Sequence, residues 1–415
     1  MGINILLVNP NRFKSPPVIP IGLEYLVSAL EKHNHNVDIL DLCFSESPEE
    51  KLTKMLLKRT YNLVGFTIRN IDSISYFNSE FFLPSMKTLI QCVKKLSIPV
   101  VLGGSGFSAM PQEILDYLGA DYGIIGPGEI IFPHFLELLQ SQKVNKQIYD
   151  GWQYGTDAEL IHLRGKKINY SKYLSGEEII GFETHKGCPD KCPFCISACS
   201  RTWYKKIPTI IEEIKFLINQ GYTHFQLCDS EFNSDINFSI KFCRSLIEEN
   251  FPMKWKLFMK PYPYNKKLFK LLQKSNAYLI DLTVFSDKKI QNLNNYSYED
   301  LEKVIEYCEK YEIELMIDSH VGYPYESLES IKDMIEFFKT HHPTKVSLNP
   351  YFRLYKHTQL AYLIKTDTSL QKHLTKCIPK DSDLLEPVFY NQVDYTILEK
   401  LISGNELFKI AWLTL

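Results

Sequence analysis

Two successive runs of alternating strand and helix patterns constrain the fold of this chain more than any other feature. In the first 145 residues, short segments rich in Val, Ile and Leu alternate with segments of helical periodicity. Short apolar strands of this kind occur in parallel sheets that helices cover on both faces. The predicted strands cover residues 3–9, 36–42, 63–68, 99–102 and 122–125, and the predicted helices cover residues 23–32, 48–58, 83–95, 112–118 and 130–139.

The same alternation returns in the middle of the chain and predicts a second α/β domain. Six strands with five intervening helices suit a partial (βα)6 barrel, because a complete (βα)8 barrel needs two more units. The predicted strands cover residues 179–184, 223–228, 254–258, 278–284, 313–319 and 345–349, and the predicted helices cover residues 209–220, 237–250, 266–274, 298–311 and 327–340.

The sequence therefore predicts an α/β protein with four parts. A doubly wound, Rossmann-like parallel-sheet domain covers residues 1–145, and a linker that passes over the surface covers residues 146–177. A partial TIM-type barrel covers residues 178–365, and a mainly helical extension covers residues 366–415. A length of 415 residues is itself too long for one ordinary domain.

Composition and charge exclude several function classes. With 47 Lys and Arg against 49 Asp and Glu, the formal net charge of -2 gives no reason to expect nucleic acid as a partner. No apolar run reaches the roughly 18 residues needed to span a bilayer, so we expect no membrane partner. The N-terminus lacks the basic region and the small-residue cleavage site of a signal peptide, so we expect a cytoplasmic protein.

Four of the ten cysteines crowd into residues 188–199. Directly after the first barrel strand, Cys188, Cys192 and Cys195 follow the spacing C-x3-C-x2-C. Three thiolates can hold an iron–sulfur cluster and leave one iron open to a small chelating molecule. The alternatives are a zinc site, with Cys199 or His185 as fourth ligand, or buried structural thiols. The other six cysteines are expected to be reduced core residues: Cys43, Cys92, Cys228, Cys243, Cys308 and Cys377.

Glycines and polar residues gather where the strands of the first domain end, which is where ligands bind in such sheets. Because glycine allows a ligand to approach the backbone closely, these ends predict a cradle for a broad, flat ligand, with ordinary tight turns as the alternative. The pattern Gly-x-Gly-x-x-Gly after the first strand is absent, which argues against NAD. The residues concerned are Asn9, Pro10, Thr67, Arg69, Asn70, Gly103, Gly104, Ser105, Gly126, Gly128 and Glu129.

The cysteine motif, with an aromatic residue just before its last cysteine, resembles that of the radical S-adenosylmethionine (SAM) superfamily. The resemblance implies that Cys188, Cys192 and Cys195 bind a 4Fe–4S cluster and that Phe194 lines the adenine side of SAM. It also implies that Asp229 or Glu231, at the end of the second barrel strand, lies near the SAM amino group, and that Lys260 meets the SAM carboxylate. Cys199 lies outside the motif and is expected in the core.

Two later segments resemble the same superfamily. Residues 322–326 resemble its Gly-x-Pro-x-Glu turn after the fifth strand, and Arg353 and Thr358 belong to a segment similar to its R-x-Y-x-x-T sequence. Each segment alone is equally well explained as a cap or a surface turn. Their order along the chain supports the resemblance.

The first domain is similar to the cobalamin-binding domain that a large branch of this superfamily carries. The similarity rests on residues 8–10 and 20–26, on Gly103-Gly104, and on Gly126-x-Gly128-Glu129. It implies that the strand-end residues named above hold cobalamin. The Asp-x-His-x-x-Gly motif that supplies an axial His to cobalt is absent. Arg69 is therefore expected at the lower face of cobalt, where a cation disfavours ligation; a surface ion pair is the alternative.

The resemblance implies a cobalamin-dependent radical SAM enzyme that methylates an unactivated carbon, or phosphorus, through methylcobalamin and a 5′-deoxyadenosyl radical. One alternative is a relative that does not methylate and performs ring contraction, cyclisation or transfer of another part of SAM. Another is a sensor that binds the cofactors without turnover. The implied partners are a small-molecule or peptide substrate and an electron donor such as flavodoxin or ferredoxin.

Overall fold

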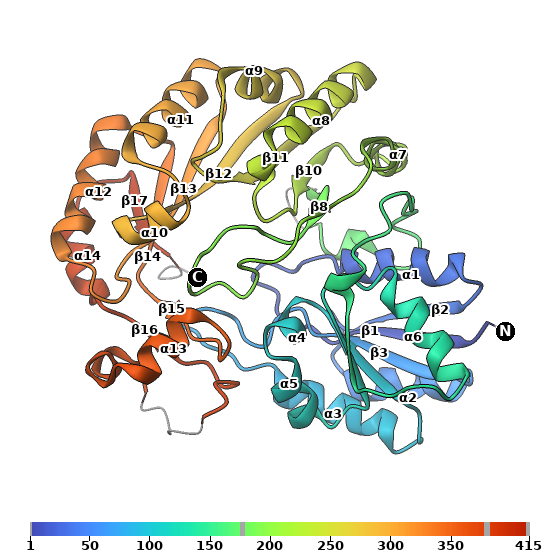
Figure 1. Cartoon of the computed structure of the whole chain (residues 1–415). Helices are drawn as coiled ribbons and strands as arrows, with labels where there is room; N and C mark the ends of the chain where they lie inside the picture. The colour runs from blue at the N-terminus through green and yellow to red at the C-terminus, as the bar shows by residue number, and fades with distance from the viewer. Residues whose placement is uncertain (1, 175–178, 377–381, 412–415) are drawn as a thin grey trace. The chain divides into compact units, whose positions relative to one another are not determined.

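The computed structural model describes residues 2–174, 179–376 and 382–411. The chain divides into two compact units, and each unit contains its own parallel sheet (Figure 1). Unit 1 comprises residues 1–178 and 203–220, and unit 2 comprises residues 179–202 and 221–415. Within the residues that the structure describes, no helix is long and apolar enough to cross a membrane.

Unit 1 is a doubly wound α/β unit, as its sequence predicts. Its parallel strands lie in the order β2-β1-β3-β4-β5-β6. Helices α1 and α6 cover one face of the sheet, and α2, α3 and α5 cover the other (Figure 1). The strands are β1 Asn4–Asn9, β2 Asn36–Asp41, β3 Leu63–Thr67, β4 Val100–Gly103, β5 Tyr122–Ile125 and β6 Ile148–Asp150; the helices are α1 Ile21–Lys32, α2 Pro48–Lys58, α3 Leu83–Lys94, α4 Ser105–Ala109, α5 Pro111–Leu118 and α6 Ile131–Gln140.

The segment predicted to be a surface linker is partly built into unit 1. β6 adds a sixth strand beside β5, and two 3-10 turns follow it, η1 Gly151–Gln153 and η2 Tyr170–Lys172. His162 and Arg164 are fully buried, so the predicted surface position is wrong for this part of the segment. A three-residue strand is too short to show the alternation of apolar and polar residues that marks a strand. Arg and His usually lie at the surface, so the sequence does not indicate that these two are buried.

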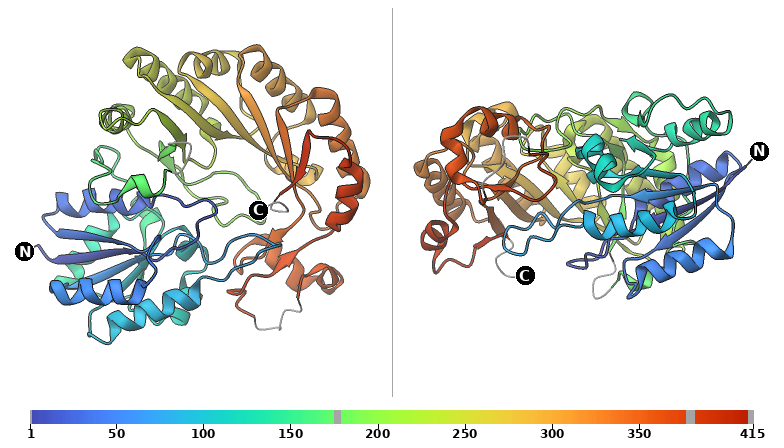
Figure 2. Two further views of the ribbon diagram at one scale, coloured as in Figure 1. Left: turned by 180° about the vertical axis from the view of Figure 1, so that it is seen from behind. Right: turned by 90° about the horizontal axis from the view of Figure 1, so that it is seen from below.

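Unit 2 contains a curved parallel sheet with helices along its outer face (Figure 2). The strand order is β17-β14-β13-β12-β11-β10-β7, with Trp255 of β11 fully buried among Phe182, Phe232 and Phe242. The strands are β7 Ile179–Phe182, β10 His224–Leu227, β11 Lys254–Met259, β12 Ala277–Phe285, β13 Glu314–His320, β14 Lys345–Asn349 and β17 Phe408–Ile410; the helices are α8 Ile236–Glu249, α9 Lys266–Lys274, α10 Lys288–Leu293, α11 Tyr298–Lys310, α12 Leu328–His341, α13 Gln359–Thr366 and α14 Tyr395–Ile402.

Two features of the barrel region differ from the expectation. The extension predicted to be mainly helical supplies a seventh strand, β17, which pairs in parallel with β14. Helix α7 Ile207–Ile218, predicted as the first barrel helix, packs as part of unit 1. The remaining short elements are β8 His185–Lys186, β9 Trp203–Tyr204, η3 Phe232–Ser234, β15 Phe352–Arg353, η4 Thr368–His373 and β16 Phe389–Tyr390.

Candidate active site

The three motif cysteines lie in a loop of unit 2 that folds back on itself after β7. The N–H of Cys188 donates to Ser200 Oγ at 2.8 Å, and the N–H of Ser200 returns to the Cys188 carbonyl at 3.0 Å. The N–H of Cys199 donates to the Asp190 carbonyl at 2.8 Å. These bonds close the loop at its base.

The sulfur atoms of the loop already receive hydrogen bonds. The N–H of Ser197 lies 3.4 Å from Cys195 Sγ, and Nδ2 of Asn294, just after α10, lies 3.5 Å from Cys192 Sγ. N–H donors of this kind favour thiolates. Asn294 also accepts the N–H of Lys191 at 3.3 Å, so it fixes this part of the loop. Nothing in the sequence marks Asn294, which follows the motif by about 100 residues.

The donor set fits an iron–sulfur cluster. Burial raises the pKa of Cys188 to about 12, and burial also raises the pKa of Cys195, so a positively charged ligand is needed to hold thiolates here. No three His, Cys, Asp or Glu side chains in the described ranges lie close enough together to hold a single metal ion. Cysteine thiolates are the usual ligands of iron–sulfur clusters, so three cysteines in one loop fit such a group.

The two acidic residues after β10 have different surroundings. Asp229 is buried, and its Oδ1 accepts the N–H groups of Thr184 at 2.7 Å and His185 at 3.2 Å. Its Oδ2 accepts the Thr184 hydroxyl and lies 3.0 Å from His185 Nδ1. Asp229 therefore fastens the stem of the cysteine loop, and both of its oxygens are engaged within the protein.

Glu231 lacks such partners. Its Oε2 atom is buried and has no hydrogen-bond partner within the described residues. Burial, reinforced by the nearby carboxylate of Asp190, raises the pKa of Glu231 well above its usual value, while Lys260 acts in the opposite direction. A buried carboxylate without a partner is costly, so it indicates a cationic ligand that supplies the missing interaction.

Lys260 follows β11 and forms an ion pair with Asp190 of the cysteine loop. Asn233 holds this segment, because its Nδ2 donates to the carbonyls of Lys260 at 2.8 Å and Pro263 at 2.6 Å. Glu231, Asp190 and Lys260 thus bring two carboxylates and one ammonium group to the loop. Asp190 and Lys260 pair with each other, so a ligand with a positive group would favour the ionised form of Glu231.

Phe194 lies at the ends of the barrel strands. Its ring centroid is 5.7 Å from that of Phe285, 5.2 Å from that of His320 and 5.0 Å from that of Phe352. Nδ1 of His320 is buried and has no hydrogen-bond partner within the described residues. Burial lowers the pKa of His320, so its ring is neutral.

The two later family-like segments have structural contacts. Glu326 accepts the N–H groups of Gly322 at 2.6 Å and Tyr323 at 3.1 Å, which closes the turn after β13. Arg353 is buried and donates from Nη2 to the carbonyls of Leu384 and Leu385 at 3.0 and 2.9 Å. The hydroxyl of Thr358 caps α13 by accepting the N–H of Ala361.

The strand ends of unit 1 bring several of the predicted cobalamin contacts together. Ser105 Oγ donates to the Arg69 carbonyl at 2.9 Å, which joins the loops after β3 and β4. The N–H of Gly126 donates to Ser108 Oγ at 3.0 Å, which joins the loop after β5 to α4. Asn9 is buried and donates to Asp41 Oδ1 at 2.9 Å, so its amide group is engaged within the unit.

Gly103 and Gly22 of unit 1 have free space next to them, whereas Gly104 does not. Gly104 needs its left-handed φ of 101°, and a Cβ there would lie 2.7 Å from the Ile68 carbonyl oxygen. At Gly103, by contrast, a Cβ would meet only the Ile124 carbonyl oxygen at 3.7 Å, and at Gly22 it would meet nothing within 4 Å. These two glycines therefore fit a surface against which a flat ligand lies.

The remaining predicted contacts lie on the same loops. Thr67 ends β3, and Arg69 and Asn70 follow it, all half-buried, while Glu129 is buried after β5. A Cβ on Gly128 would lie 2.7 Å from Leu26, so this glycine allows close packing on α1. Pro10, directly after β1, is buried as well.

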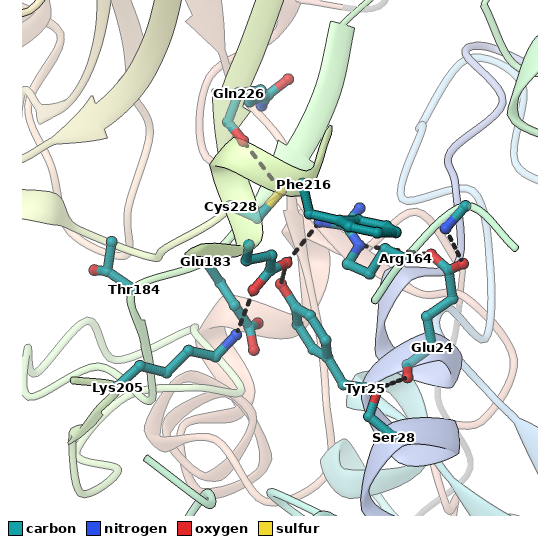
Figure 3. Close-up of polar contacts among 12 residues, drawn as sticks. Glu24, Tyr25, Ser28, Arg164, Glu183, Thr184, Lys205, Phe216, Gln226 and Cys228 are labelled. Atoms are coloured by element: carbon teal, nitrogen blue, oxygen red, sulfur yellow. Dashed lines mark hydrogen bonds and ion pairs between the residues drawn. The ribbon is translucent and has the colours of Figure 1, made fainter. Parts of the chain in front are cut away.

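Sequence reasoning missed a buried charge network in unit 1 (Figure 3). Glu213 of α7 accepts hydrogen bonds at Oε1 from Arg164 Nη1 at 2.9 Å and the Tyr25 hydroxyl at 3.0 Å, and Lys205 Nζ lies 3.6 Å from its Oε2. Glu24 of α1 accepts the N–H of Gly165 at 2.7 Å and lies 3.5 Å from Arg164 Nε. The network ties α7 and the segment around Arg164 to α1.

The cysteines outside the motif follow the expectation in part. Cys43, Cys243 and Cys308 are buried free thiols. Cys228 and Cys199 are exposed, so the core position predicted for each is wrong; Cys199 has a left-handed φ of 58° in the turn that closes the loop. Cys92 is half-buried, and Cys377 lies outside the described residues.

Two family models match the chain. The B12 binding domain matches residues 15–136, and the radical SAM superfamily matches residues 182–338. A tryptophan 2-C-methyltransferase of Streptomyces laurentii is 23% identical over 417 residues, which cover 80% of this chain and 69% of that enzyme. A cytidylyl-2-hydroxyethylphosphonate methyltransferase of Streptomyces wedmorensis is 20% identical over 356 residues, which cover 68% of this chain and 65% of that enzyme.

Solved structures share the whole fold. The radical SAM methyltransferase TsrM of Kitasatospora setae, with cobalamin and a 4Fe–4S cluster bound, superposes with a TM-score of 0.89 at 21% identity, covering 98% of this chain and 93% of that one. TsrM with tryptophan and the SAM analogue aza-SAM gives a TM-score of 0.84 at 22% identity, covering 96% and 87%.

Proposed function

The chain belongs to the radical SAM superfamily, in the branch that carries a B12-binding domain, and from this premise we propose that it is a cobalamin-dependent methyltransferase. The methyl acceptor we propose is a carbon or phosphorus centre of a small molecule or peptide. Both relatives named above are methyltransferases, and one of them acts on carbon.

The observation that carries the proposal is the buried Oε2 atom of Glu231, which lies close to the cysteine loop and has no hydrogen-bond partner within the described residues. We assign Cys188, Cys192 and Cys195 to the 4Fe–4S cluster and Glu231 to the SAM ammonium. Asp229 is a positioning residue for the loop stem, because both of its oxygens are occupied. Phe194 offers an aromatic face for adenine, and Lys260 offers a cation for the SAM carboxylate once it leaves Asp190.

The cobalamin residues we propose are those on the strand-end loops of unit 1. A Cβ at Gly103 or Gly22 would meet no atom closer than 3.7 Å, so these backbone positions can be approached closely by a ligand. Arg69, at the end of β3, is our candidate for the lower face of cobalt, where its positive charge would disfavour an axial ligand. When both groups are bound, the cluster supplies single electrons and cobalamin carries the methyl group.

Electrons must come from outside the chain, so we propose flavodoxin or ferredoxin as the donor. The cytoplasm is the compartment we propose, because it keeps thiols reduced and so available to iron. The cysteines within the described residues are all free thiols, which is consistent with that compartment.

The first test is the metal content after anaerobic reconstitution with iron, sulfide and hydroxocobalamin, followed by gel filtration. We expect about four irons and one cobalt per chain. Iron without cobalt would contradict the cobalamin half of the proposal, and zinc without iron would contradict the radical half. Arg69→Ala should alter the cobalamin absorption spectrum; an unchanged spectrum would remove Arg69 from the cobalt site.

Product analysis separates methylation from other cobalamin-dependent chemistry. Methyl transfer by the proposed route yields S-adenosylhomocysteine and 5′-deoxyadenosine, and deuterium from a labelled substrate appears in the latter. A non-methylating enzyme yields no S-adenosylhomocysteine with substrate. A sensor cleaves no SAM even with a strong reductant.

A further inference from the structure

The cysteine loop contacts a small C-terminal subdomain of unit 2. This subdomain, here called the cap, comprises residues 351–376 and 382–391 and contains β15, α13, η4 and β16. It has its own apolar core, which includes the buried residues Phe352, Leu354, Leu360, Ala361, Ile364, Leu370, Leu384, Val388 and Tyr390. Phe194 of the cysteine loop packs against this core.

Two contacts join the cap to the part of the cysteine loop that lies between Cys192 and Cys195. The N–H of Leu360, in the first turn of α13, donates to the Pro193 carbonyl at 2.9 Å. The ring of Phe352 meets that of Phe194 at 5.0 Å and 60°, an edge-on geometry that aromatic pairs favour. Pro193 and Phe194 are the two residues between Cys192 and Cys195.

The cap is itself held rigidly at this point. Arg353, next to Phe352, donates to the carbonyls of Leu354, Leu384 and Leu385, and its guanidinium lies 4.8 Å from the ring centroid of Tyr355. The N–H of Leu354 donates to the Val388 carbonyl at 2.9 Å. Because buried polar groups gain from complete pairing, these bonds fix β15, and with it Phe352.

The loop is thus supported from two sides. Asn294 holds Lys191 and Cys192, and the cap holds Pro193 and Phe194. We propose that the cap positions the Cys192–Cys195 half of the loop, and that Phe352 is a positioning residue for SAM binding at the cluster. This inference rests on the proposed function, because it presumes that the loop holds a cluster that binds SAM.

The test compares two substitutions within the same apolar core. Phe352→Leu removes the ring that touches Phe194, whereas Leu370→Ala makes a cavity in the same core at a residue that has no hydrogen bond or ring contact with the loop within the described residues. Both variants should lower the thermal midpoint. We expect Phe352→Leu to keep about four irons but to bind SAM about tenfold more weakly, with altered g values of the reduced cluster, while Leu370→Ala retains both properties.

Three outcomes would overturn the inference or its premise. Wild-type SAM affinity and g values in Phe352→Leu would overturn the positioning role, and so would an equal loss in Leu370→Ala. Failure of the wild-type chain to hold four irons would instead overturn the proposed function. If Phe352→Leu does not fold, Phe352→Met against Leu370→Met applies the same criteria with a smaller disturbance.

Discussion

Glu213 in unit 1 and Glu231 in unit 2 are both carboxylates in buried surroundings, but their partners differ. Glu213 accepts hydrogen bonds at Oε1 from Arg164 and Tyr25, and its Oε2, which has no hydrogen-bond partner within the described residues, lies 3.6 Å from Lys205 Nζ. Glu231 Oε2 has no hydrogen-bond partner within the described residues, and its pKa is raised by burial and by Asp190. A carboxylate paired within the protein contributes to the fold, whereas one left unpaired at a loop of thiols is suited to a ligand.

The same contrast separates the two acids after β10. Asp229 lies two residues from Glu231, yet it is engaged by Thr184 and His185. The resemblance alone could not distinguish them, because both are acidic residues at the end of one strand. The two residues differ in whether both carboxylate oxygens have partners within the protein. Substitutions of paired and unpaired carboxylates test this difference.

The largest effect is expected at the cysteines. Cys192→Ala removes one of the three thiols that we assign to the cluster, so iron binding and all SAM-dependent activity should be lost. Cys199→Ala is the matched control, since Cys199 is an exposed thiol close to the same loop. Iron content and visible absorption after reconstitution measure both. Equal iron loss in the two variants would contradict the assignment of the motif.

A large loss of stability is expected in the unit 1 network. Arg164→Met leaves Glu24 and Glu213 buried without their shared cation, which should cost roughly 3–5 kcal/mol of unfolding free energy. Arg59→Met breaks the more exposed pair with Asp38 and should cost about 1 kcal/mol or less. Urea unfolding measures both variants. A loss below 1 kcal/mol for Arg164→Met would show that the network is not essential to the fold.

Glu231→Gln should weaken SAM binding without loss of stability, the opposite of what we expect for Arg164→Met. Because the neutral amide is easier to bury than a carboxylate, stability should stay the same or rise. SAM affinity should fall about 10- to 100-fold, since the ammonium loses its charged partner. Equilibrium dialysis with the reconstituted protein measures the affinity. A stability loss comparable to that of Arg164→Met would place Glu231 among the structural acids.

The sequence predicts long elements well and short ones poorly. Strands such as β1 and β3 carry nearly continuous apolar runs and lie where they were predicted, whereas β6 and β17 have three residues each and show no period. The cysteine motif lies within one short segment, so it can be recognised from the sequence alone. The roles of Asn294 and Phe352 cannot be recognised in this way, because each residue contacts the motif only through the tertiary fold, about 100 or more residues further along the chain.

Asp281 of β12 is a third acidic residue to compare with Glu213 and Glu231. Its titration should make the free energy of unfolding depend on pH. Burial and the neighbouring carboxylate of Asp318 raise the pKa of Asp281 to about 7. Between about pH 4 and pH 7 the folded state therefore binds this proton while the unfolded state has released it. The stabilisation that comes from holding this proton in the folded state is fully present at acidic pH and is lost as the pH rises towards 7.

Asp281→Asn removes this titration, because the amide has no proton to lose. At pH 8 the variant should exceed the wild type by up to about 4 kcal/mol, the free-energy equivalent of a pKa of about 7 against the ordinary 3.8, whereas at pH 4 the two should be nearly equal. Urea unfolding at both pH values measures the difference, with Asp116→Asn on the exposed side of α5 as the control that should show little change. The same difference at both pH values would mean that the pKa of Asp281 is the same in the folded and unfolded states, which would contradict this prediction.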